Sequence, residues 1–218
     1  MTNLATDLID RLAGSAETTL LVPLLRLLAD GDPVSIDDLA AAAALTADEV
    51  RARLAAMPDT EYDDQGRIIG QGLTLRPTRH RFTVAGEELY TWCALDTLIF
   101  PTLIGRPARI ESVSPASGDT IRVTVDPTAG VTSVEPITAV VSLVDPGNLP
   151  SIRSSFCNQV HYFTSPEDAG GWLAEHPEGR VLSVAEAFGL GRNLLPETLA
   201  RPVSGTGDGS YRGPDACC

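Results

Sequence analysis

The hydrophobic pattern of the first eighty residues is typical of short helices followed by a hairpin. Six leucines among residues 20–29 lie nearly all round a helix and predict that it is buried, and a shorter helix is expected over residues 7–12. Ser35 and Thr46 each precede an apolar run and are followed three residues later by an acidic residue, which is typical of helix N-termini. Turn residues at 63–66 then separate two short extended segments. Helices followed by a hairpin form the outline of a winged helix.

Beyond residue 80 the pattern is mainly that of β-strands. Alternating polarity predicts strands at 73–75, 80–84, 109–113, 120–125, 139–144 and 155–163. Helices are expected over residues 87–100, ended by Pro101, over residues 166–175, and from Ser183 to about residue 188.

These elements predict an α+β protein with three parts. We expect a winged-helix-like three-helix domain at residues 1–80, followed at 81–200 by a mainly antiparallel β domain with flanking helices. Glycine, serine and proline dominate residues 201–218, so a flexible tail is expected there.

The composition limits what the protein can bind. The net charge is −13, and residues 1–80 hold 13 acidic residues against 7 arginines. An acidic surface repels phosphate backbones, so we expect no nucleic-acid partner, although winged helices can read DNA. All 16 basic residues are arginine, and the absence of lysine excludes Schiff-base and P-loop lysine chemistry.

Four cysteines carry the candidate chemistry, and only Cys93 and Cys157 fall in the expected folded body, because Cys217 and Cys218 end the tail. The chain lacks an apolar run of about 18 residues and the basic start of a signal peptide. We therefore expect a cytoplasmic protein without a membrane partner. Thiols stay reduced in that compartment, which argues against a disulfide between Cys93 and Cys157.

Asp96 follows Cys93 by three residues, so the two share a face of the expected helix. Leu89 and Phe100 extend this face and make it mostly apolar. An aspartate in such a place has a raised pKa, which suits a general acid that works near neutral pH. The spacing also fits a solvated Asp96 beside a cysteine that only fills the core.

Cys157 lies in the expected strand at 155–163, where alternation places His161 on the same face. The pair could bind a metal ion together, or both could be ordinary buried residues. Arg153, four residues before Cys157, could hold a carboxylate such as Asp96 or could be a surface charge.

Several of these segments together resemble a known family. The run LYTWCALDTLIFPTLIGR, residues 89–106, resembles the signature of alkylmercury (organomercurial) lyases. Residues 152–163, residues 186–191, the leucine-rich helix and the segment that begins EYDDQGRIIG resemble further blocks of the family. The blocks follow one another at the family's spacing from about residue 20 to residue 193.

The resemblance implies protonolysis of a carbon–mercury bond, with a hydrocarbon and Hg(II) as products. It also implies that Cys93 and Cys157 bind mercury, which prefers thiolates, and that Asp96 moves a proton from a cysteine to the departing carbon. Hg(II) would stay on the two sulfurs until external thiols, and possibly a mercuric reductase, remove it. No cofactor is implied.

The chain departs from the family pattern at two places. Ser114 stands where many relatives have a third cysteine, which is usually read as structural, so stability or solubility rather than activity could differ. Cys217 and Cys218 could collect Hg(II) from the catalytic pair, or the tail could have no function. Two alternatives stay open: a non-catalytic Hg or Cu carrier that uses Cys93, Cys157 and His161, and a metal-responsive winged-helix regulator.

Overall fold

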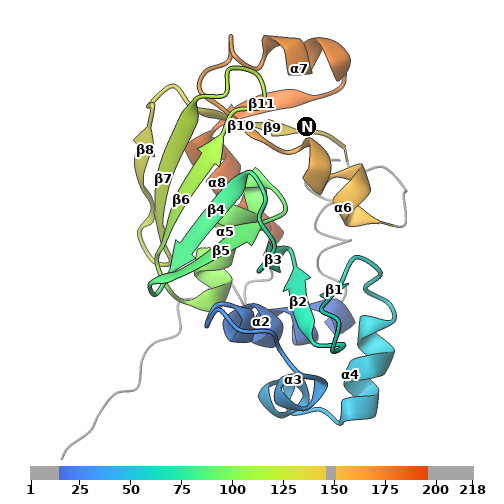
Figure 1. The fold of residues 1–218 in the computed structure, drawn as a ribbon. Coiled ribbons are helices and arrows are strands. Elements are labelled where there is room, and N and C mark those ends of the chain that lie inside the picture. Colours follow the sequence, from blue (N-terminus) through green and yellow to red (C-terminus); the bar gives the residue numbers. More distant parts are fainter. Residues whose placement is uncertain (1–14, 146–150, 196–218) are drawn as a thin grey trace, which may run out of the picture.

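The N-terminal part of the chain folds into a small cluster of helices. The computed structural model describes residues 15–145 and 151–195, so the helix expected over residues 7–12 and the tail with Cys217 and Cys218 lie outside the described residues. The cluster lies at one end of the molecule (Figure 1) and consists of α2 (Ser15–Leu28), α3 (Ile36–Ala43) and α4 (Ala47–Leu54).

The starts of α3 and α4 were predicted correctly, whereas α2 begins at Ser15, before the expected start at residue 20. The Ser35 hydroxyl accepts a hydrogen bond from the Asp38 amide at 3.1 Å. Thr46 and Glu49 form a complete capping box, in which each side chain accepts from the other residue's amide. These bonds provide acceptors for backbone amides that have no partner within the helix at its start.

A single antiparallel sheet runs from the N-terminal hairpin through the body of the molecule (Figure 1). Its strand order is β1-β2-β3-β5-β4-β6-β7-β8. The strands are β1 (Glu61–Tyr62), β2 (Ile68–Gln71), β3 (Leu73–Thr74), β4 (His80–Val84), β5 (Glu87–Thr91), β6 (Ala108–Val113), β7 (Thr120–Asp126) and β8 (Gly130–Glu135). The hairpin that would form the wing is therefore part of the same sheet as the strands that follow it.

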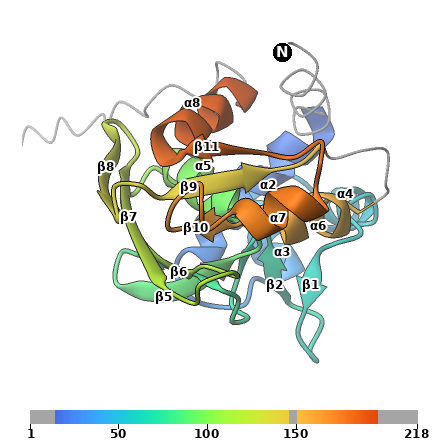
Figure 2. The ribbon, with the colours of Figure 1, turned by 90° about the horizontal axis from the view of Figure 1, so that it is seen from above.

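A second, three-stranded sheet has the order β10-β9-β11 and is built from β9 (Val140–Leu143), β10 (Tyr162–Phe163) and β11 (Arg180–Ser183). The helix α7 (Gly170–Glu175) lies beside it, and α8 (Val184–Leu194) follows β11 directly (Figure 2). The Ser183 cap of α8 was predicted, but the helix continues beyond the expected end at residue 188.

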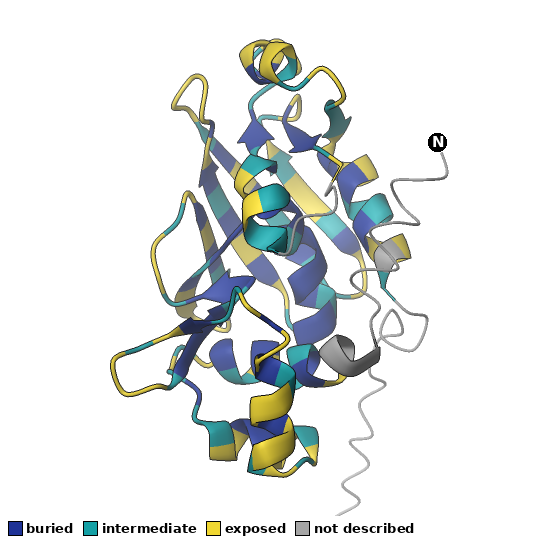
Figure 3. Ribbon diagram, turned by 90° about the vertical axis from the view of Figure 1, so that its right-hand side faces the viewer, coloured by how far each residue is buried: buried dark blue, intermediate teal, exposed yellow. Residues whose placement is uncertain are grey.

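The central helix α5 (Ala94–Ile104) contacts α2, α8 and the main sheet. Nine of its eleven residues are buried. A helix that is apolar all round must be covered on every side, and α5 meets that condition. Exposed residues gather instead on the turns and on the outward faces of the peripheral helices (Figure 3).

The expectation of one helix over residues 87–100 is wrong. Residues Glu87–Thr91 form β5, which pairs with β4 through a two-residue turn. Both turn residues, Ala85 and Gly86, have positive φ, at 53° and 97°. This geometry belongs to the tight turns that match the twist of a hairpin. The helix begins only after Cys93 and continues through Pro101 to Gly105.

The expectation of a strand over residues 155–163 is also wrong. The segment begins with the last residue of α6 (Ile152–Ser155) and continues with a 3₁₀ helix at Cys157–Gln159, and only Tyr162–Phe163 forms a strand. The helix expected over residues 166–175 is shorter, and the strands β8 and β11 were not foreseen. No described helix is both long and apolar enough to cross a bilayer.

Ser114 is buried and forms a side-chain hydrogen bond away from the pocket described below. Its side chain is 2% exposed, and its hydroxyl donates to Asp168 Oδ2 at 2.7 Å. The same carboxylate oxygen accepts from the amide of Thr164 at 2.9 Å. Ser114 therefore ties the end of β6 to the segment that precedes α7.

Ser114→Ala is expected to lower the free energy of unfolding by about 0.5–1.5 kcal/mol, because the mutation removes one of the hydrogen bonds to the half-buried Asp168 carboxylate. Urea denaturation would measure the loss. Ser117→Ala, which removes a longer and exposed bond to the same carboxylate, should cost less. Equal stability of the wild type and the Ser114 variant would contradict the structural role.

Candidate active site

The first turn of α5 brings Cys93 and Asp96 together. Cys93 is the N-cap residue, with extended backbone at φ −144° and ψ 167°. Its Sγ accepts a hydrogen bond from the Asp96 amide at 3.4 Å, and the Asp96 carboxylate accepts from the Cys93 amide at 3.2 Å. The pair thus forms a reciprocal capping box, in which a thiol takes the place of the usual hydroxyl. The start of the helix, rather than its face, fixes the two groups side by side.

Cys157 completes a cluster of three groups. One ligand atom each from Cys93, Asp96 and Cys157 lies within 4.8 Å of the others, and no other group of this kind occurs in the described part of the chain. Both thiols are buried and free. The Ala94 amide donates to the carbonyl of Val160 at 3.1 Å, which joins the start of α5 to the segment that carries Cys157.

Burial sets the protonation of this cluster. It raises the pKa of the Asp96 carboxyl to about 6, although hydrogen bonds from Cys93 oppose the shift. Burial also raises the pKa of Cys93, and its interactions with Cys157 and Asp96 act in the same direction. A hydrogen bond from Cys93 favours the thiolate of Cys157, but burial and the negative Asp96 outweigh it and raise that pKa too. At neutral pH the two thiols of the free site therefore keep their protons while Asp96 is mostly a carboxylate, and a soft metal ion must displace the thiol protons on binding.

An apolar pocket of about 100 Å³ opens beside Asp96 and Cys157. Its polar side chains are these two and Gln71, and its apolar walls come from Leu21, Trp92, Leu95, Ile99, Phe100, Ile152 and Phe156. Gly72 also lines it with φ +76°, and a Cβ there would lie 2.6 Å from the Phe100 ring. Residues of α2 and the N-terminal hairpin thus form part of the wall.

The structure decides two alternatives that the sequence leaves open for neighbouring residues. His161 is not part of the cluster, since its ring stacks on His80 at a centroid distance of 6.1 Å. Burial lowers the pKa of His161 to about 4, so it is neutral at neutral pH. Arg153 does not hold Asp96: its Nη1 lies 2.5 Å from Glu61 Oε1, and its guanidinium lies over Trp92.

The raised pKa of Asp96 predicts a pH dependence of stability. The folded protein binds this proton more tightly than the unfolded chain, so the contribution is present below about pH 4 and is lost as pH rises through about 6. At pH 7.5, Asp96→Asn should therefore raise the free energy of unfolding by on the order of 2 kcal/mol. Urea denaturation of both proteins at pH 4 and pH 7.5 would measure this difference. An increase in the free energy of unfolding at pH 7.5 that is no larger than at pH 4 would contradict the raised pKa of Asp96.

The cluster defines a kind of site: two thiols that could hold a soft metal ion, with a carboxyl group next to them. Two family models together match residues 1–196. The model described as alkylmercury lyase matches residues 73–196, and the one described as the helix-turn-helix domain of alkylmercury lyase matches residues 1–72. The division expected at residue 80 stays a prediction.

Curated relatives agree with these matches. The alkylmercury lyase of Streptomyces lividans is 53% identical over 94% of this chain and 91% of its own length. That of Pseudomonas putida is 51% identical over 83% of this chain and 85% of its own. The chain therefore belongs to the alkylmercury lyase family of enzymes. A solved structure titled "Crystal structure of the mercury-bound form of MerB2" shares the fold, with a TM-score of 0.70 at 24% identity over 91% of this chain and 97% of that one.

Proposed function

We propose that this enzyme cleaves the carbon–mercury bond of organomercurials by protonolysis, with Cys93, Cys157 and Asp96 as catalytic residues. The observation that supports these roles most strongly is the grouping of two thiols and one carboxyl within 4.8 Å. Thiolates are the ligands that mercury prefers. A carboxyl with a pKa of about 6 can both accept and return a proton near neutral pH.

The reaction begins when a substrate R–Hg–SR′ enters. One cysteine replaces SR′ on mercury, and its proton leaves with R′SH. The second cysteine then gives its proton to the Asp96 carboxylate, and its thiolate binds mercury. Two thiolates increase the electron density at the mercury-bound carbon. The protonated Asp96 finally donates to that carbon, so that R–H forms as the carbon–mercury bond breaks. Hg(II) remains on two thiolates, and Asp96 is again a carboxylate.

The pocket supports this assignment because its walls are mainly apolar. An organic group of the substrate would displace water from these walls, which favours binding. Water kept away from the carbon leaves Asp96 as the proton donor. The acid and one thiol both line the pocket, so a mercury atom bound there would lie within reach of each.

We also propose the setting in which the enzyme works. The reaction needs no resident cofactor, since the two cysteines and the aspartate supply the ligands and the proton. External thiols accept the Hg(II), and a mercuric reductase is the proposed next partner. A cytoplasmic location would keep the cysteines reduced, and the activity would serve mercury resistance.

Cys217 and Cys218 are proposed as a hand-off pair for Hg(II). Adjacent cysteines rarely form a disulfide with each other, so both thiols would be free to take the ion. Replacing both with serine should slow the release of Hg(II) several-fold under limiting external thiol, without slowing cleavage. Stopped-flow transfer to a dithiol chelator would measure release, and equal release rates in the two proteins would rule out the hand-off.

Incubation with methylmercury and excess thiol tests the proposed function. An organomercurial lyase gives methane and Hg(II) in equal amounts. A metal carrier with the same cysteines would bind methylmercury and give no methane. A winged-helix regulator would instead show salt-dependent DNA binding in a gel shift with or without Hg(II). Methane in the first assay and no shifted band in the second is the expected result.

A further inference from the structure

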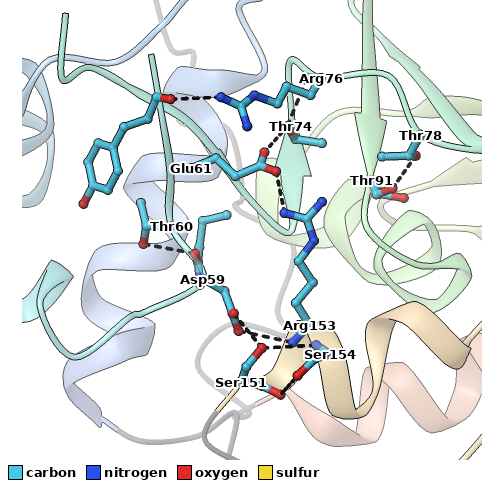
Figure 4. A network of polar contacts seen from close by, with 12 residues as sticks. Asp59, Thr60, Glu61, Thr74, Arg76, Thr78, Thr91, Ser151, Arg153 and Ser154 are labelled. Atoms are coloured by element: carbon cyan, nitrogen blue, oxygen red, sulfur yellow. Dashed lines mark hydrogen bonds and ion pairs between the residues drawn. The ribbon is translucent and has the colours of Figure 1, made fainter. Parts of the chain in front are cut away.

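Two carboxylates of the N-terminal part reach across to α6, the helix that precedes Cys157 (Figure 4). Asp59 Oδ1 accepts from the Ser151 hydroxyl at 2.6 Å. Its Oδ2 accepts from the Arg153 amide at 3.2 Å. Glu61 of β1 forms an ion pair with Arg153, with 2.5 Å between Oε1 and Nη1. Glu61 and Arg153 are 92 positions apart in the sequence, so this is a tertiary contact between two distant segments.

The Glu61 carboxylate occupies a position that the surrounding residues are shaped to hold. Its side chain is only 6% exposed, and its second oxygen accepts from the Thr74 hydroxyl. A Cβ at Gly70 would collide with this carboxylate and would lie 2.7 Å from Thr74 Oγ1. Glycine at residue 70 therefore leaves the space that Glu61 fills. A carboxylate this deeply buried must be paired, so Glu61 determines where the Arg153 guanidinium lies.

Arg153 connects the segments that carry the two thiols. Its guanidinium carbon lies 4.6 Å from the centre of the Trp92 ring, a cation–π contact. Trp92 is adjacent to Cys93 and lines the pocket. Arg153 itself belongs to α6, which leads directly into the 3₁₀ helix that begins at Cys157. Arg153 thus contacts Trp92, the neighbour of Cys93, and belongs to the helix that precedes Cys157.

We propose that Glu61 is a positioning residue for carbon–mercury cleavage. Through Arg153 it fixes the Trp92 wall and the Cys157 segment, so that both sulfurs face one mercury atom. This inference rests on the proposed function. It also implies that the helix-turn-helix part of the chain contributes to catalysis, because the Glu61 carboxylate of its hairpin helps to position the groups of the active site.

Glu61→Gln is expected to lower kcat about tenfold and to change KM less than twofold. Second-layer contacts to metal ligands are typically worth 10–100-fold in affinity or activity. A single thiolate suffices to capture the substrate, whereas cleavage needs both sulfurs on mercury. The affinity for inorganic Hg(II), measured by competition with a dithiol, should also fall about tenfold. Glu111→Gln is the matched control, since Glu111 pairs with Arg81 and Arg122 on an exposed face and does not line the pocket.

A double-mutant cycle with Arg153→Met separates positioning from a general loss of stability. Rates are compared per folded protein, with folding followed by circular dichroism at the assay temperature. If Glu61 acts through Arg153, the double variant is no slower than the slower single variant. Effects that multiply, or a folded Glu61→Gln variant with the wild-type kcat and Hg(II) affinity, would overturn the proposal.

Two outcomes distinguish this proposal from the proposed function. If the wild type released no methane, the proposed function would fail, and the Hg(II) affinities of the same variants would decide the positioning role. If Glu61→Gln failed to fold, Arg153→Lys would decide it, since lysine keeps a positive charge beside Glu61 but lacks the planar guanidinium that lies over Trp92. A folded Arg153→Lys protein with the wild-type kcat and Hg(II) affinity would overturn the proposal.

Discussion

Asp96→Asn is expected to slow carbon–mercury cleavage by about 10²–10⁴-fold, the range typical for loss of a general acid. Asparagine has nearly the same shape and can still accept the hydrogen bond from the Cys93 amide, which is 3.2 Å long in the wild type. The start of α5 should therefore keep its conformation. What disappears is the proton that the carboxyl delivers to carbon. The two thiols remain, so the affinity for Hg(II) should change only a few-fold.

Hydrocarbon release and Hg(II) binding would be measured on the same protein sample. Asp30→Asn is a suitable control, because Asp30 is an exposed carboxylate that pairs with Arg106. A variant at Asp96 that released hydrocarbon at the wild-type rate would contradict the proposed acid. Loss of Hg(II) binding together with cleavage would instead make Asp96 a ligand or a structural residue.

Cys157→Ser is expected to impair both carbon–mercury cleavage and Hg(II) binding, whereas the Asp96 variant should lose cleavage alone. A hydroxyl is a poor ligand for a soft ion and keeps its proton at neutral pH. Mercury would then be held by Cys93 alone, and cleavage should fall by about 10³-fold or more, as when one member of a concerted catalytic group is lost. The Hg(II) affinity should fall by orders of magnitude.

Single-turnover hydrocarbon release and dithiol competition would measure the two losses. His161→Gln provides the comparison, since His161 lies outside the cluster and should leave both properties near the wild type. A large loss of Hg(II) affinity in the His161 variant, with a small one in the Cys157 variant, would favour the carrier that uses histidine.

Sequence rules for helix capping predicted the structure correctly where one residue determines the backbone conformation at the start of a helix. Ser35 and Thr46 identified two helix starts, because a side chain that caps an amide acts within one turn. The same rule missed the start of α5, where the capping residue is Cys93, a residue that is not usual at this position. Cys93 and Asp96 were still placed together, since the distance of three residues suits a capping box as well as a helix face.

Long-range contacts explain what could not be predicted. Cys157 was assigned to a strand because residues 155–163 alternate, yet Cys157–Gln159 is a 3₁₀ helix, and the segment is joined to the start of α5 by the hydrogen bond from the Ala94 amide to the Val160 carbonyl. The partner of Arg153 is Glu61, 92 residues earlier, and nothing in the local pattern marks this carboxylate as buried. Trp92 and Gln71 were likewise missed as pocket residues, since only the packing of α2, the hairpin and α5 creates the pocket.

The source of the hydrogen in the product tests the central claim most directly. The protein, equilibrated in D₂O so that the carboxyl and thiol protons are exchanged, would be mixed with methylmercury and thiol in the same solvent. Mass spectrometry of the gas would then identify the methane. Protonolysis through Cys93, Cys157 and Asp96 predicts singly deuterated methane, CH₃D, in an amount equal to the Hg(II) formed. Undeuterated methane, or Hg(II) formed without methane, would contradict it.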